Sequence, residues 1–161
     1  TVGMLYCSAE PNSEYQVNAV TEALKKLNPD LEITNYTFAD SNDISSVATS
    51  ASESDVIYIP TDNTAANNTE AINNVLEPAG VPVITGEVGI CEGCGIATLS
   101  ISYYDLGYTT GEMAYEILEE GADISTMAVQ YAPNVTKQYM ADRCEKLGIT
   151  VPDDYEAIEA E

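Results

Sequence analysis

The sequence predicts an α/β protein, a three-layer sandwich with a mainly parallel central sheet of about five strands. Short runs rich in β-branched residues alternate with longer segments whose apolar residues recur at helical spacing, which is the pattern of βαβ units. Two of the short runs, residues 2–7 and 56–59, are apolar almost throughout and are therefore expected to be inner strands. The 161 residues, 45% of them hydrophobic, are enough for one core.

The first half of the chain contains three strand–helix pairs. Ser13 and Gln16 form a capping box at the start of the first helix, and an Asn-Pro-Asp turn at residues 28–30 ends it. The second and third helices are marked by apolar residues around Ala48 and Ile72. The strands expected here are residues 2–7, 31–38 and 55–59.

The second half begins with a strand at residues 82–85, followed by a glycine-rich loop at 86–95 and a strand-like run at 96–101. A second capping box, Ser102 with Asp105, opens a helix that Gly121 ends. We further expect a strand at residues 126–131 and a helix at 136–147. These assignments make residues 1–152 a single α/β lobe and residues 153–161 a frayed acidic tail.

The composition excludes several functions. Acidic residues number 27 against 5 basic ones, so the formal net charge of -22 disfavours nucleic acid and anionic lipid as partners. The absence of histidine excludes His-based zinc sites and triads. We predict no cofactor, no metal and no catalytic residue, because the polar loops contain no nucleophile paired with a base. The sequence contains no apolar run of the ~20 residues that span a bilayer.

Polar loops follow the first, third and fourth predicted strands. Ligands of open parallel sheets bind beyond the carboxyl ends of the strands, and helix N-termini there favour a carboxylate. Acidic side chains in the same loops suit an ammonium, so the set predicts a zwitterion site for an amino-acid-like solute. The alternative is that these residues only cap helices. The candidate ligand-binding residues are Ser8, Glu10, Asn12, Ser13, Asp62, Asn63, Thr64, Glu87, Tyr104 and Asp105.

The cysteines leave other interpretations open. Cys7 ends a strand, as in phosphate-handling cysteine loops of flavodoxin-like enzymes or phosphocarriers, but its loop is acidic and a core role is favoured. Cys91 and Cys94 form a CxxC motif among glycines, which suggests a local disulfide or two free thiols rather than a metal or redox centre.

Three motifs carry a resemblance to a known family: GMLYCSAEPNS at residues 3–13, DVIYIPTDNT at 55–64 and SISYYDLG at 100–107. Together, in this order and spacing, they resemble the C-terminal half of ABC-transporter substrate-binding proteins of the type I periplasmic-binding fold. The similar group includes binders of tryptophan and other aromatic amino acids. The Cys91–Cys94 loop departs from that pattern, so it gives no guide to ligand identity.

The resemblance implies a two-lobed protein that closes on its solute and delivers it to an ABC permease and its ATPase, without catalysis. It implies an extracytoplasmic location, either periplasmic or as a cell-surface lipoprotein. We expect the N-terminal lobe and any anchor to lie outside this sequence. A sensory ligand-binding domain of the same fold is the remaining alternative.

Overall fold

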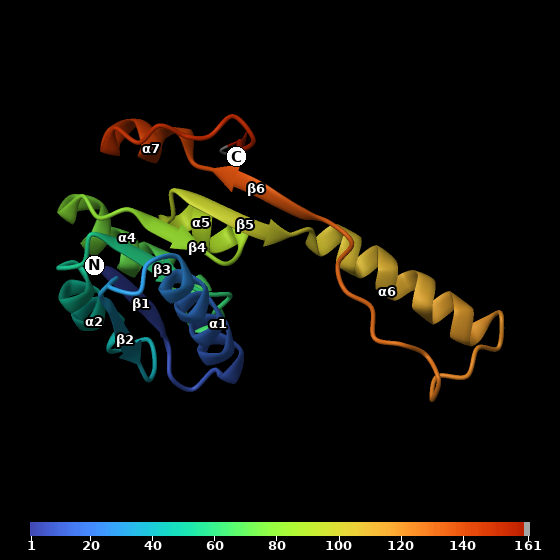
Figure 1. The fold of residues 1–161 in the computed structure, drawn as a ribbon. Coiled ribbons are helices and arrows are strands. Elements are labelled where there is room, and N and C mark those ends of the chain that lie inside the picture. The colour runs from blue at the N-terminus through green and yellow to red at the C-terminus, as the bar shows by residue number, and fades with distance from the viewer. Residues whose placement is uncertain (160–161) are drawn as a thin grey trace.

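The computed structural model describes residues 1–159, which form one seven-stranded sheet with helices on both faces (Figure 1). The strand order is β2-β1-β3-β4-β5-β6-β7, and all neighbours are parallel except the antiparallel pair β5–β6. The predicted fold class is thus confirmed, with two strands more than expected and with β1 and β3 inside the sheet. The strands are β1 (Val2–Cys7), β2 (Ile33–Phe38), β3 (Val56–Ile59), β4 (Val83–Thr85), β5 (Ala97–Ile101), β6 (Val135–Tyr139) and β7 (Glu156–Ala157).

The helices divide unequally between the two faces of the sheet. Because side chains alternate along a strand, Leu5 and Cys7 of β1 face one way while Met4 and Tyr6 face the other. The first face packs against α2, α4 and α5 and holds the larger core cluster, whereas the smaller cluster on the second face packs against α1. The helices are α1 (Pro11–Leu27), α2 (Ile44–Ala51), α3 (Asn63–Ala66), α4 (Thr69–Ala79), α5 (Val88–Cys94), α6 (Tyr103–Leu118) and α7 (Ala141–Leu147).

Helix α6 and the segment after it form an arm, residues 103–134, that extends away from the sheet (Figure 1). Ser102 caps α6 by accepting a hydrogen bond from the Asp105 N–H at 3.1 Å, which confirms that α6 starts after Ser102, although no reciprocal bond from Asp105 completes a capping box among the described contacts. Within the described part of the chain, the 16 residues of α6 include none that is buried. Hydrophobic side chains along the arm, such as Tyr104 and Leu118, are each 79% exposed. The packed body therefore consists of residues 1–101 and 135–159.

Several local predictions were wrong. The glycine-rich stretch forms helix α5, because Glu87 caps its first turn. Residues 126–131 contain no strand, and the helix expected at 136–147 is strand β6 followed by α7. The first capping box does not form, since Glu10 is the N-cap of α1 and Pro11 its first residue.

The tail is more ordered than predicted, because β7 pairs with β6. Residues 160–161 of that tail lie outside the described residues. No helix in residues 1–159 is long and apolar enough to cross a membrane.

Candidate functional site

The carboxyl ends of β1, β3, β4 and β5 meet at one edge of the sheet, because these four strands run parallel. The residues that follow these strands carry all ten predicted ligand-binding residues. We call this the carboxyl edge: residues 8–13, 60–64, 86–87 and 102–105. The predicted residues are therefore close in space, although their surroundings differ.

Asp62 is turned into the protein and is only 1% exposed. One carboxylate oxygen accepts hydrogen bonds from the Cys7 N–H at 2.7 Å and the Ser13 hydroxyl at 2.8 Å, and the other accepts from the Ala65 N–H at 2.8 Å. Ser13 is itself fully buried. These contacts join β1, α1 and α3, so Asp62 and Ser13 act as an internal anchor. The expectation that either one touches the solute is not supported by this geometry.

Glu10 links the loop after β1 to the first turn of α3. Its carboxylate accepts hydrogen bonds from the N–H groups of Asn63 and Thr64, at 2.9 and 2.8 Å, and from their side chains, at 3.0 and 2.8 Å. Desolvation raises the pKa of Glu10, but the four hydrogen bonds outweigh it and lower the pKa to about 2. The side chain is therefore ionised near neutral pH and remains partly open to solvent.

Glu87 is buried at 8% exposure and caps α5. It accepts hydrogen bonds from the Gly89 N–H at 2.9 Å and from the Ile90 N–H. The pKa of the Tyr103 hydroxyl is raised by desolvation and by the negative charge of Glu87. Tyr103 is half exposed and Tyr104 is 79% exposed, so the edge presents two phenol rings to solvent. Only Tyr104 was among the predicted ligand-binding residues. The two consecutive tyrosines in the sequence could also have identified Tyr103 as a candidate.

The remaining predicted residues keep polar atoms at the surface. Ser8 and Asn12 are exposed, and each donates to a backbone oxygen, the Ser8 hydroxyl to Phe38 at 3.3 Å and the Asn12 amide to Thr61 at 2.9 Å. Asp105 is half-buried at the start of α6 and accepts a hydrogen bond from the Asn134 side chain at 3.1 Å.

The charge at this edge is one-sided. Its ionisable groups are carboxyls and phenols, and no lysine or arginine stands in residues 8–13, 60–64, 86–87 or 102–105. The backbone N–H groups in the first turns of α3 and α5 already bond Glu10, Asp62 and Glu87. The starts of α3 and α5 therefore present no free anion site, whereas a ligand ammonium would meet a favourable field at this edge.

The four cysteines are buried, free thiols. Cys7 is 2% exposed and donates to the Ala39 oxygen at 3.6 Å, which places it in the core. Burial raises the pKa of Cys91 and that of Cys94 to about 12, so neither thiol is poised for nucleophilic chemistry. Within residues 1–159 no cluster of three or more potential ligands could hold a metal ion.

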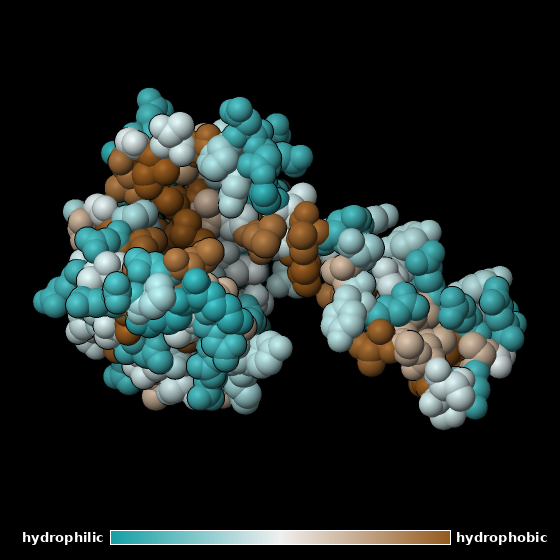
Figure 2. Space-filling model, viewed as in Figure 1, coloured by the Kyte–Doolittle hydropathy of each residue, from teal (hydrophilic) through white to brown (hydrophobic). Residues whose placement is uncertain are grey.

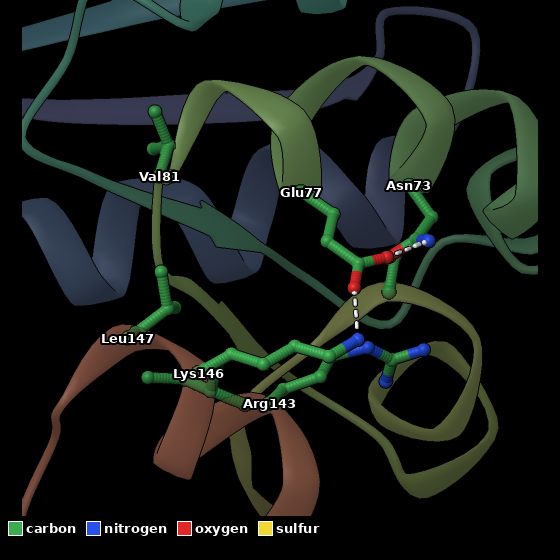
Figure 3. A pocket seen from close by; sticks show the side chains of 9 residues that line it. Asn73, Glu77, Val81, Arg143, Lys146 and Leu147 are labelled. Carbon is green, nitrogen blue, oxygen red and sulfur yellow. Dashed lines mark hydrogen bonds and ion pairs between the residues drawn. The ribbon is translucent and has the colours of Figure 1, made fainter.

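A pocket of about 190 Å³ lies at the opposite edge, between α4 and α7 (Figure 3). Two of its charged groups, Glu77 and Lys146, form an ion pair. Glu77 accepts hydrogen bonds from the Lys146 ammonium and the Asn73 amide, both at 2.7 Å. Val81 and Ile96, which lie within two residues of the starts of β4 and β5, also line this pocket. It is therefore separated from the carboxyl edge by the length of the strands.

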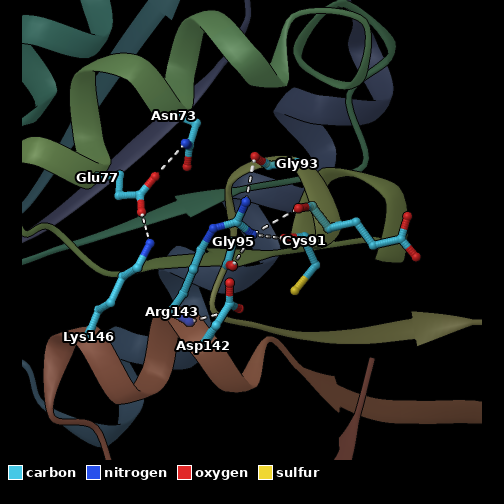
Figure 4. Close-up of polar contacts among 9 residues, drawn as sticks. Asn73, Glu77, Cys91, Gly93, Gly95, Asp142, Arg143 and Lys146 are labelled. Carbon is cyan, nitrogen blue, oxygen red and sulfur yellow. Dashed lines mark hydrogen bonds and ion pairs between the residues drawn. The ribbon is translucent and has the colours of Figure 1, made fainter. Parts of the chain in front are cut away.

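Arg143 was missed by the sequence analysis, yet it fixes the end of α5 (Figure 4). Its guanidinium donates to four backbone oxygens, those of Cys91, Glu92, Gly93 and Gly95, at 2.9–3.1 Å. A cation at a helix C-terminus satisfies its orphan carbonyl groups and its dipole. No local sequence pattern could have predicted this contact, because Arg143 and α5 are some fifty residues apart in the sequence.

Comparison with known proteins identifies the family of this chain. Residues 1–160 match the family model described as ABC transporter substrate binding protein. The chain belongs to this family. The tyrosine-binding protein of Clostridioides difficile (strain R20291) is 31% identical over 119 residues, which is 73% of this chain and 34% of that relative.

Solved structures of the family share the fold. A Streptococcus pneumoniae ABC domain in complex with L-Trp is 26% identical with a TM-score of 0.86, and the match covers 97% of this chain and 55% of that one. A ligand-free, open substrate-binding protein with adhesive properties from Clostridium difficile is 29% identical with a TM-score of 0.74, covering 99% and 54%. This chain thus spans about a third of the curated relative's length and just over half of the solved ones.

Proposed function

We propose that this chain is the C-terminal half of a two-lobed, extracytoplasmic solute-binding component of an ABC importer. Family membership and a length just over half that of the solved relatives support this proposal. In it, residues 1–152 belong to one lobe, apart from the arm, and the carboxyl edge faces a second lobe across the ligand. The protein binds and releases its solute without making or breaking a covalent bond.

The proposed ligand is an amino acid, with aromatic amino acids as the first candidates. The names of two relatives, a tyrosine-binding protein and a domain bound to L-Trp, support this choice. The one-sided charge of the carboxyl edge supports it independently and is the observation that carries the proposal. Glu10 and Asp105 suit a ligand ammonium, and the rings of Tyr103 and Tyr104 suit an apolar side chain.

The same charge pattern assigns the ligand carboxylate to other partners. With no lysine or arginine at this edge, that carboxylate must bind neutral donors, such as Ser8 and Asn12, or a cation supplied by the second lobe. The two lobes would thus hold opposite ends of a zwitterion, which makes closure depend on the ligand.

The arm is the proposed link to that second lobe. No described residue of α6 is buried, and a helix without a packing partner has little stability, because most helical stability in proteins comes from packing. We assign the hydrophobic side chains of α6 to a contact with the second lobe, next to the hinge. The permease and ATPase subunits are the proposed downstream partners. A sensory domain of the same fold would share these features and differ in its partners.

Calorimetry on the full-length protein tests this function, with tyrosine, tryptophan, phenylalanine and leucine as ligands. Asp105→Asn is expected to weaken amino-acid binding about 30- to 150-fold, roughly 2–3 kcal/mol, because it removes the charge that faces the ammonium. Asp30→Ala, on the exposed turn between α1 and β2, serves as the matched control and is expected to bind like the parent. Unchanged affinity in Asp105→Asn, or no binding of any amino acid by the parent, would contradict the proposal.

A further inference from the structure

Asp105 differs from the other acidic residues of the carboxyl edge in how its oxygens are used. The carboxylates of this edge are those of Glu10, Asp62, Glu87 and Asp105. In the first three, both oxygens accept hydrogen bonds from the protein itself. Among the hydrogen bonds of residues 1–159, the Asp105 carboxylate accepts only one, through Oδ2. Its Oδ1 atom is therefore the carboxylate oxygen at this edge that remains available to a ligand.

Asn134 donates that one hydrogen bond from the far end of the arm. Its side-chain amide lies 3.1 Å from Oδ2 of Asp105, across 29 residues of sequence. The two ends of the arm meet because Ile101 of β5 pairs with Val135 of β6 (Figure 1). Pro133, whose ring fixes its backbone φ angle, directly precedes Asn134. The donor is thus placed by the sheet, independently of the helix that carries its acceptor.

The backbone of Asp105 is fixed as well. The Ser102 hydroxyl accepts a hydrogen bond from the Asp105 N–H at 3.1 Å, and the Ser102 carbonyl accepts one from the Leu106 N–H at 3.0 Å. A fixed backbone still leaves the side-chain torsions of an aspartate free to change. The bond from Asn134 restricts them, so the carboxylate is oriented before a ligand arrives, which lowers the entropic cost of binding.

The neighbours of this pair in the chain are hydrophobic. Ile101, Tyr103 and Val135 all remain exposed to solvent. Figure 2 shows hydrophobic side chains gathered where the arm leaves the body. A carboxylate makes a strong, charge-assisted hydrogen bond with an ammonium group, and an apolar surface beside it suits a large hydrophobic side chain. The surroundings of Asp105 therefore match both parts of an aromatic amino acid.

We propose that Asn134 is a positioning residue of the solute site, which holds the Asp105 carboxylate so that Oδ1 accepts the ammonium group of the ligand. This inference rests on the proposed function, since the ammonium belongs to the proposed amino-acid ligand. Asn134 acts through Asp105: without the Asn134 amide, the carboxylate keeps its charge but loses its fixed orientation. Because both residues belong to the arm, the ligand ammonium is recognised where the arm joins the body.

Calorimetry on the full-length protein with Asn134→Leu tests the proposal. Leucine has nearly the shape of asparagine but no hydrogen-bond donor. Tyrosine, tryptophan, phenylalanine and leucine are each compared with the analogue that lacks the amino group, for example tyrosine with desaminotyrosine. The variant is expected to bind the amino acids that the parent binds about tenfold more weakly, as for the loss of one hydrogen bond to a charged group, and to bind the amine-free analogues like the parent. An equal loss for an amino acid and its analogue would overturn the proposal, because a purely structural role affects both.

A double-mutant cycle with Asp105→Asn shows whether Asn134 acts through Asp105. When Asp105 is already replaced, Asn134→Leu is expected to change amino-acid affinity by less than about twofold. A tenfold loss in both backgrounds would contradict the proposal. The cycle uses the amino acid alone, so it decides even where an amine-free analogue binds too weakly to measure.

Asn74→Leu, on the exposed side of α4, is the matched control and is expected to bind like the parent. All variants are expected to keep the unfolding midpoint of the parent, because both Asn134 and Asn74 are exposed. Unchanged amino-acid binding by Asn134→Leu refutes this inference alone and leaves the proposed function intact. Absence of amino-acid binding by the parent refutes both.

Discussion

The body of the molecule and its arm have similar sequence patterns but different surroundings. In the body, α4 buries Ile72 and Leu76 against the sheet and its neighbouring helices. In the arm, α6 repeats apolar residues at helical spacing and, among the described residues, buries none of them. The difference teaches that hydrophobic periodicity predicts a helix and its apolar face, but it does not identify the partner of that face.

The largest expected difference between the two regions is in core truncation. Ile72→Ala should lower the free energy of unfolding of this 161-residue chain by about 3–4 kcal/mol, because it leaves a cavity in the main cluster. Ile117→Ala on α6, the matched change in the arm, should cost under about 0.5 kcal/mol.

Urea denaturation of both variants measures this contrast. In the full-length protein, Ile117→Ala is expected to become costly, by about 2 kcal/mol, once the second lobe covers α6. An equal loss for the two variants in the 161-residue chain would mean that the arm packs on the body after all.

Substitution of Asp62 is expected to have the next largest effect, and it distinguishes a structural role of this carboxylate from a role in ligand binding. Asp62→Asn replaces one of the two acceptor oxygens by an N–H₂ group, so either the Cys7 N–H or the Ala65 N–H loses its acceptor, and we expect a loss of about 2–3 kcal/mol in unfolding free energy. Thermal or urea unfolding provides the measurement, with Asp30→Asn as the surface control. If the variant is fully stable but no longer binds solute, Asp62 contacts the ligand and its anchoring role is wrong.

Arg143 is expected to have a somewhat smaller effect. Arg143→Met keeps the length of the side chain but leaves the four backbone oxygens at the end of α5 without their donor, at a cost of about 2 kcal/mol. Because the damage is local, hydrogen exchange should accelerate in α5 while α1 is unchanged. Uniform acceleration across the sheet would argue against a local role.

Glu10 should give the smallest effect, and one that depends on pH. Its pKa of about 2 in the folded protein lies below the ordinary value of 4.5, so its stabilising contribution is present above pH 4.5 and disappears as the pH falls towards 2. Because the side chain is partly exposed, this contribution is discounted to about 1 kcal/mol. The difference in unfolding free energy between the parent and Glu10→Gln should therefore shrink between pH 5 and pH 3, and a constant difference would contradict the hydrogen-bonded geometry.

Local patterns in the sequence predicted most of the fold. The apolar runs at β1 and β3 identified inner strands, and Ser102 with Asp105 marked the start of α6. The prediction failed where distant contacts decide the structure. In helix α5, for example, the local cap Glu87 holds the first turn, but the end of the helix is held by Arg143, far along the chain.

In the candidate site, too, local features were predictable and distant contacts were not. Strand order brought the polar loops to one edge, as predicted, but spacing alone could not distinguish surface groups from internal ones. Asp62 and Ser13 form a buried pair across 49 residues of sequence, and only the tertiary structure reveals it. The fold class was therefore predictable from periodicity, whereas the orientation of individual carboxylates was not.

The buried thiols of α5 provide a way to measure how often this helix opens to solvent. Burial raises the pKa of Cys91 to about 12, so this thiol is protonated at pH 7, whereas the thiolate is the form that reacts with alkylating agents. Reaction at Cys91 or Cys94 therefore requires α5 to open to solvent first. The labelling rate of the two thiols is then a direct measure of how often this helix detaches from the sheet, with no probe attached to the protein.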